Sequence, residues 1–95
     1  TVSPFNYPSL KNVMDAGLTI RTLSQRGGQY DGKWRYLLSM DMRYRAMQKF
    51  RDHVEIKNGK LVKQQEILSK GYVGFGLARL NYTSDEFVIH YGKPI

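Results

Sequence analysis

The clearest hydrophobic pattern in the chain is an alternation of apolar and polar residues between positions 34 and 42. The apolar residues at the even positions are Trp34, Tyr36, Leu38, Met40 and Met42. The odd positions are mostly charged or polar, and only Leu37 breaks the alternation. Because successive side chains of a strand point to opposite faces, this segment is predicted to be a strand that buries its even face.

The hydrophobic period changes after residue 43, where apolar residues recur at spacings of three and four, beginning with Tyr44, Met47 and Phe50. This spacing favours a helix over residues 43–53, because residues three and four apart share one face of a helix. A continued strand is the alternative, because no turn residue interrupts the segment before Phe50.

The N-terminal residues 1–8 contain two prolines and are predicted to form an extended arm. Ser9 is a suitable N-cap for a short helix that ends at Gly17. Apolar and polar residues then alternate from Leu18, which predicts a strand of about six residues.

The pair Asn58 and Gly59 is typical of a two-residue turn, because both residue types tolerate a positive φ. It predicts a hairpin that joins residues 54–56 to residues 61–62. Residues 72–82 and 87–91 are apolar and rich in β-forming residues, so they are predicted to be further strands. The last forty residues would then form an antiparallel meander.

These elements together predict an α+β fold in a small single domain. Its antiparallel sheet of about five strands would carry one or two helices packed on one face. The domain would comprise residues 9–95, preceded by the arm of residues 1–8.

Composition narrows the classes of function. A chain of 95 residues and 11.0 kDa has room for one domain. It contains no cysteine, which excludes disulfides, thiolate zinc sites and cysteine nucleophiles. No apolar run is long enough to span a membrane, and no metal-ligand spacing or cofactor motif is present, so neither metal nor cofactor is expected. The lack of cysteine and of a signal peptide favours an intracellular or virion-associated protein.

Charge supplies the main functional hypothesis. The chain has a formal net charge of +7. The segment from Arg21 to Arg51 contains eight Lys and Arg residues and only two carboxylates. Guanidinium groups match phosphate geometry and aromatic rings stack unpaired bases, so this segment predicts a non-catalytic nucleic-acid-binding module, for RNA more than DNA. The predicted binding residues are Arg21, Arg26, Lys33, Arg35, Arg43, Tyr44, Arg45, Lys49 and Arg51.

Other partners and functions fit the same composition. A basic surface also suits plain solvation, an acidic protein partner or an anionic membrane surface. A structural role is the main alternative, as a homo-oligomeric viral matrix- or capsid-like subunit or an interaction domain of a larger chain. A second alternative is a small toxin-like ribonuclease that uses His53 and His90, the only two imidazoles. No catalytic residue is otherwise indicated.

The segment from Lys70 to Leu77 resembles the aromatic strand of RNA-recognition motifs, in which Lys or Arg and Gly precede spaced aromatic residues. Tyr72 and Phe75 are three residues apart, so a regular strand would turn them to opposite faces. A bulge at Gly74 would place both rings on the same face of the strand. Alternatively, the glycines of this segment are places where a helix or another strand packs closely.

Overall fold

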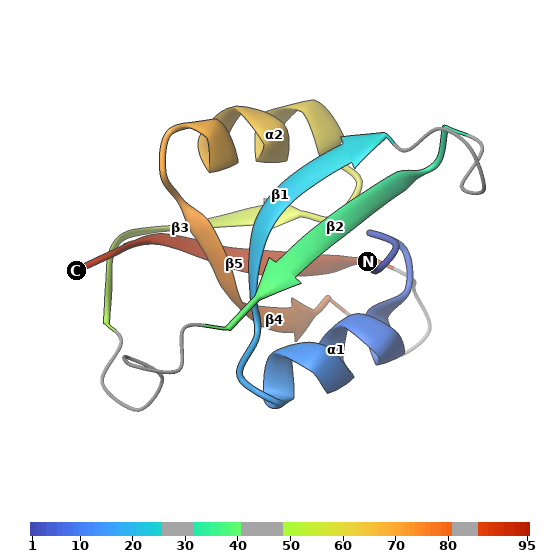
Figure 1. Cartoon of the computed structure of the whole chain (residues 1–95), viewed down its shortest axis with the longest axis horizontal. Helices are drawn as coiled ribbons and strands as arrows, with labels where there is room; N and C mark the ends of the chain where they lie inside the picture. The colour runs from blue at the N-terminus through green and yellow to red at the C-terminus, as the bar shows by residue number, and fades with distance from the viewer. Residues whose placement is uncertain (26–31, 41–48, 81–85) are drawn as a thin grey trace.

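A five-stranded antiparallel sheet and two helices make up the described part of the chain, which comprises residues 1–25, 32–40, 49–80 and 86–95 of the computed structural model (Figure 1). The elements are α1 (Tyr7–Asp15), β1 (Thr19–Gln25), β2 (Trp34–Ser39), β3 (Phe50–Lys57), α2 (Leu61–Ser69), β4 (Val73–Arg79) and β5 (Phe87–Pro94). The strand order is β2-β1-β4-β5-β3. This architecture confirms the predicted α+β class. Neither described helix is long and apolar enough to cross a membrane.

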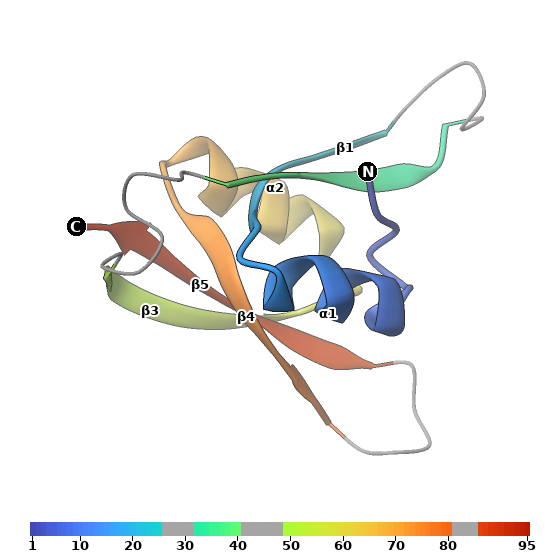
Figure 2. The same ribbon diagram turned by 60° about the horizontal axis from the view of Figure 1, so that its bottom comes forward.

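The sheet bends sharply between β1 and β4, where only Ile20 and Gly74 are in register. Figure 2 shows β1 and β2 on one side of the helices and β3, β4 and β5 on the other. A Cβ on Gly74 would lie 3.0 Å from Ile20 and 3.1 Å from Ile89. The absence of a side chain at Gly74 therefore lets β1 and β4 approach, which confirms the prediction of close packing there.

Both helices pack on one face of the bent sheet and enclose the core. Leu10 of α1 and Tyr36 of β2 are fully buried, as are the three alternate β5 residues Phe87, Ile89 and Tyr91. The even face of β2 points into this core, because Trp34 and Leu38 pack against the same cluster. The predicted alternation is thus confirmed over the residues of β2.

A buried hydrogen-bond network crosses the core. The hydroxyls of Tyr36 and Tyr91 both donate to Oε1 of Gln64, each at 2.6 Å. Nε2 of Gln64 donates to the carbonyl oxygens of Asn58, at 3.0 Å, and Lys57, at 3.3 Å. Burial raises the pKa of both phenols above the ordinary value, because the phenolate form loses its hydration. Gln64 therefore joins α2 to β2, β5 and the end of β3.

The first helix begins earlier than predicted. Its N-cap is Asn6, whose Oδ1 accepts the Ser9 N–H at 3.2 Å, so the prediction of Ser9 as the N-cap is wrong. Pro8 lies in the first turn, where a residue without an N–H costs the helix no hydrogen bond. Residue Val2, before the helix, forms an isolated antiparallel bridge with Tyr36.

The prediction of a helix over residues 43–53 is wrong for residues 50–53, which belong to β3. Residues 43–48 lie outside the described part of the chain. Pairing with β5 accounts for the strand, because Phe50 faces Pro94 and Ile56 faces Ile89 in register. The alternative of a strand is therefore the correct one for this part of the segment.

The predicted hairpin at Asn58 and Gly59 is also wrong, because α2 and not a strand comes after the turn. The buried Asn58 side chain donates to Pro4 O at 3.0 Å and accepts from Phe87 N at 3.2 Å, which ties the turn to β5 and the N-terminal residues. Helix α2 separates β3 from β4, so the predicted uninterrupted meander is wrong. The strands predicted within residues 72–82 and 87–91 are confirmed by β4, over Val73–Arg79, and by β5, whereas residues 81 and 82 lie outside the described part of the chain.

Candidate functional site

Four rings gather on the face of the sheet that carries no helix in the described part of the chain. They are Phe50, His53, Phe75 and His90, here called the aromatic patch. The Phe50 and Phe75 rings are stacked, with centroids 4.4 Å apart and planes 7° apart. His53 and His90 lie 5.0 Å and 6.3 Å from the Phe75 centroid. Phe75 is therefore the centre of the patch.

Strand geometry places the patch opposite the core. Ile89 and Tyr91 are buried in the core, so His90 between them points to the other face. The β4–β5 register shifts between Gly74 and Gly76, so the bulge considered in the sequence analysis is present, and it lets Phe75 turn toward His90.

The bulge does not bring Tyr72 to the patch, because Tyr72 packs against the core cluster. Only one aromatic residue of the segment that resembles an RNA-recognition motif therefore lies on the helix-free face. The second ring of the stack comes from another strand, β3.

A second irregularity lies in β3. The register with β5 shifts between Arg51 and Val54, and Asp52 has a φ of 56°. Such a positive φ is uncommon for a residue other than glycine. The shift falls directly before or at His53, whose imidazole contacts Phe75. Two bulges, one in each of the strands that flank β5, thus bring the rings together.

Two glycines leave room beneath the rings. A Cβ on Gly92 would lie 2.9 Å from Phe50 Cβ, 3.1 Å from Phe75 Cε1 and 3.2 Å from the carbonyl oxygen of Arg51. A Cβ on Gly76 would meet its nearest neighbour, His90, at 3.4 Å. A side chain at position 92 therefore requires the stacked Phe50–Phe75 pair to move, whereas a Cβ at position 76 makes an ordinary van der Waals contact.

Gly92→Ala is therefore expected to lower the free energy of unfolding by about 1–3 kcal/mol, as overpacking does. Gly76→Ala, on the same face, is the matched control and is expected to change it by less than about 1 kcal/mol. Urea denaturation of both variants measures the difference. Equal stabilities for the two variants would show that the stacked pair does not depend on Gly92.

Each imidazole of the patch has a polar partner within the chain. His53 Nε2 lies 2.8 Å from the carbonyl oxygen of Phe50. His90 Nδ1 lies 3.4 Å from Oε1 of Glu55, its register partner on β3. The Glu55 side chain is 63% exposed, so this pair lies at the surface. His53 Nε2 is thus hydrogen-bonded to the chain, and His90 lies at ion-pair distance from a carboxylate.

Cations concentrate at one end of the β3–β5 pair. Arg51 lies directly opposite Lys93, and the carbonyl oxygen of Lys49 accepts the N–H of Ile95. Lys93 Nζ lies 5.2 Å from the ring centroid of Tyr72. No carboxylate among the described residues forms an ion pair with Lys49, Arg51 or Lys93, here called the basic end. Like charges opposite each other destabilise a strand pair, so a bound anion would relieve this arrangement.

The structure separates the predicted binding residues. Lys49 and Arg51 belong to the basic end, next to Phe50. Arg21 Nε donates to Ser39 Oγ at 3.0 Å, and Arg35 donates to Thr1 Oγ1 at 3.3 Å and Thr1 O at 3.2 Å.

The β1–β2 pair, which holds Arg21 and Arg35, lies at the other end of the strand order from β3. Lys33 is exposed immediately before β2. The remaining predicted residues lie outside the described part of the chain: Arg26, Arg43, Tyr44 and Arg45.

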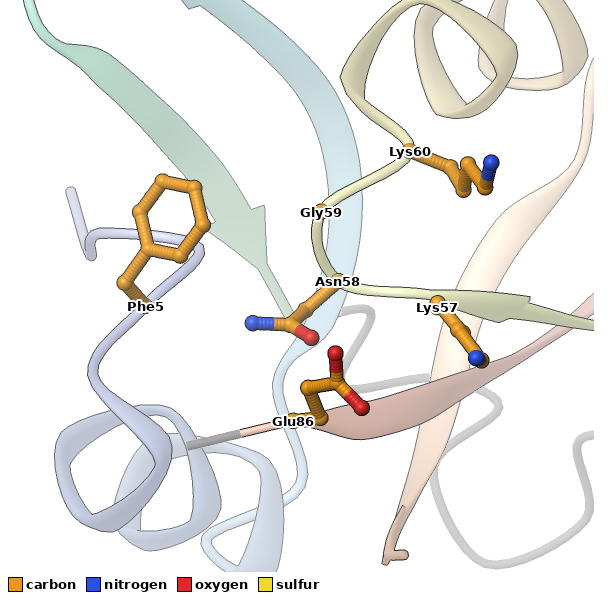
Figure 3. A pocket seen from close by; sticks show the side chains of 6 residues that line it. All are labelled: Phe5, Lys57, Asn58, Gly59, Lys60 and Glu86. Carbon is orange, nitrogen blue, oxygen red and sulfur yellow. The ribbon is translucent and has the colours of Figure 1, made fainter. Parts of the chain in front are cut away.

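A hollow of about 430 Å³ lies at the turn between β3 and α2, lined by Phe5, Lys57, Asn58, Gly59, Lys60 and Glu86. Figure 3 shows the two lysine side chains on the side of the turn away from Phe5. The Asn58 side-chain amide is hydrogen-bonded to the backbone of Pro4 and Phe87, as described above. The lining side chains therefore do not converge on one point, and the hollow is a weaker candidate than the aromatic patch.

In the described residues, no group of three or more His, Asp or Glu side chains is placed to hold a metal ion. Comparison of the chain with protein-family models, curated proteins and solved structures finds no match. Arguments about function therefore come from the geometry of the patch and its surroundings.

Proposed function

We propose that this chain binds single-stranded RNA on the helix-free face of its sheet. Unpaired bases would stack on the aromatic patch, and phosphates would lie against the basic end. The observation that supports this proposal is the stacked Phe50–Phe75 pair on the helix-free face. It lies next to the start of edge strand β3, where Arg51 and Lys93 project to the opposite face with no ion-pair partner among the described residues. The proposal keeps the predicted partner and adds Phe50, which the sequence did not connect with RNA binding.

Stacking supplies affinity without requiring a base sequence. Phe50 and Phe75 are half-buried, so part of each ring remains accessible. Every base has an apolar π-face, and stacking of one base on an aromatic side chain contributes about 1–3 kcal/mol. Sheet faces without helices are a common platform for such contacts, because neighbouring strands hold the rings at a fixed separation. The rigid pairing of β3, β5 and β4 provides this platform.

The cations supply the contribution that depends on salt. Lys49 directly precedes the edge strand β3, Arg51 follows Phe50 in it, and Lys93 lies opposite Arg51. Arg51 and Lys93 point to the face opposite Phe50, so phosphates would reach them around the open edge of β3. A strand that stacks on Phe50 would bring its phosphates to this edge. Each neutralised phosphate of a single strand releases counterions, so log K falls with log salt by about 0.7 per contact. Three contacts therefore predict a slope near −2.

Phe75→Leu is expected to weaken binding of a labelled single-stranded RNA about tenfold, because leucine keeps apolar volume but offers no ring for stacking. Fluorescence anisotropy at several salt concentrations measures both affinity and slope. Phe75→Tyr keeps the ring and is expected to bind like the parent chain.

Phe5→Leu is the matched control, because Phe5 is 55% exposed and lies outside the patch. Thermal unfolding of each variant establishes that the fold is retained. Equal affinity of the Phe75→Leu and Phe5→Leu variants, or binding that does not respond to salt, would contradict the proposal.

Self-assembly is the second candidate, because β3 is an edge strand in the strand order. An unpaired edge offers hydrogen-bonding groups to another chain. However, β3 carries exposed charges at Arg51, Asp52, Glu55 and Lys57, and its register is irregular. Charges and bulges on an edge strand oppose pairing with a second strand. Light scattering that detects a salt-independent oligomer free of nucleic acid would favour assembly over RNA binding.

A further inference from the structure

The two histidines of the aromatic patch are arranged as an acid–base pair on the face that we assign to RNA. We propose that this face also cleaves RNA, with the 2′-hydroxyl of the substrate as the nucleophile. This inference rests on the proposed function, because a bound strand must first place a phosphodiester beside the patch. His53 and His90 would be its catalytic residues.

The fold brings together two imidazoles that are distant in the sequence. His53 comes from the irregular part of β3 and His90 from the centre of β5, and both rings contact Phe75. Neither centroid lies more than 6.3 Å from the Phe75 centroid. A base stacked at Phe75 would therefore have an imidazole on either strand close to its sugar and phosphate.

Hydrogen-bond partners identify which nitrogen of each ring is available. The Phe50 carbonyl can only accept, so His53 Nε2 carries the proton of that contact and Nδ1 is left with a lone pair. His90 Nδ1 faces the Glu55 carboxylate at ion-pair distance, 3.4 Å, so His90 Nε2 is the nitrogen that would meet a ligand. No described residue occupies either remaining nitrogen. Fixing one ring nitrogen to orient the other is how proteins position a histidine for proton transfer.

The reaction balances with these two groups alone. His53 Nδ1 takes the proton of the 2′-hydroxyl as the 2′-oxygen bonds to phosphorus. The bond from phosphorus to the 5′-oxygen breaks, and that oxygen takes a proton from Nε2 of the doubly protonated His90. The products are a 2′,3′-cyclic phosphate and a 5′-hydroxyl end.

Glu55 and Lys57 would support this step. Oε1 of Glu55 lies 3.4 Å from His90 Nδ1 and would act as a positioning residue that orients the imidazole. Lys57 is two residues from Glu55 on β3 and so shares its face of the strand. Its ammonium carries a positive charge that would offset the negative charge on the non-bridging phosphate oxygens in the transition state.

The test uses a 5′-labelled single-stranded RNA and the parent chain, with His53→Asn and His90→Asn variants purified in parallel. The parent chain is expected to give fragments that end in 2′,3′-cyclic phosphate. Each histidine variant is expected to lose at least about a hundredfold in rate, because general acid–base catalysis contributes about that much or more. Glu55→Gln keeps an acceptor without the charge and is expected to lower kcat with KM unchanged.

Binding is measured separately with a 2′-O-methyl strand of the same sequence, which lacks the nucleophile. The affinity of each histidine variant for this strand gives the RNA concentration that saturates it, and cleavage rates are compared at saturation so that a loss of binding is not taken for a loss of catalysis. Binding without cleavage, or equal cleavage by the parent chain and both histidine variants, overturns the inference and leaves RNA binding standing. Failure to bind either strand overturns the proposed function together with this inference.

Discussion

Gln64→Leu is expected to lower the free energy of unfolding by about 3–5 kcal/mol. Each buried hydroxyl left without an acceptor costs about 1–3 kcal/mol. The substitution removes the acceptor that Tyr36 and Tyr91 share, and because the two hydroxyls can then bond only to each other, one of them is left without an acceptor. The Asn58 carbonyl also loses the Gln64 Nε2 donor, whereas Lys57 O still accepts from Lys60 N at 3.0 Å. Denaturant unfolding followed by the fluorescence of Trp34 measures the loss.

Gln65→Leu is the matched control, because it makes the same change at the next position. Gln65 is partly exposed, and its Nε2 donates only to Leu23 O, at 2.8 Å. This variant is expected to lose about 1 kcal/mol. Adding Tyr36→Phe and Tyr91→Phe to Gln64→Leu removes the hydroxyl that lacks an acceptor and is expected to recover about 1–3 kcal/mol. Equal losses for Gln64→Leu and Gln65→Leu would contradict the assigned role of the network.

The network also shows why part of the fold was predictable from the sequence. Tyr36 lies in a strict alternation and Tyr91 in a run of β-forming residues, so both were placed in strands by local pattern. The number of strands and the two-layer class could be inferred from such segments. Helix α2 was missed because Asn58 and Gly59 form a strong turn signal that is equally compatible with a helix or a strand after the turn. The buried Gln64 gives no signal in a pattern of apolar residues.

The aromatic patch could not be predicted, because two register shifts create it. A bulge changes which face a side chain occupies, and only pairing with β5 shows where the shifts fall. The glycines of β4 did signal a bulge, but nothing local connected Phe75 with Phe50. The excess of basic residues predicted nucleic acid as the class of partner, and the predicted binding residues included Lys49 and Arg51. It did not reveal Lys93, which reaches the same end of the sheet through the β3–β5 register.

The unfolding free energy is also expected to fall steeply as the pH rises above about 10. Burial raises the pKa of Tyr36 and Tyr91 above the ordinary value of 10.0 for this side chain. Above that pH the unfolded chain releases both phenol protons while the folded chain retains them, so the folded state binds more protons. The stability that this difference supplies is fully present below pH 10 and is lost toward the raised pKa values.

The expected slope depends on the number of retained protons. Each tyrosine contributes about 1.4 kcal/mol per pH unit, so the pair contributes about 2.7 kcal/mol per unit above about pH 10. Denaturant unfolding at a series of alkaline pH values measures this slope. Tyr91→Phe removes one of the two protons and is expected to halve it. An unchanged slope in that variant would mean that other titrating groups, and not the phenols held by Gln64, govern unfolding in alkali.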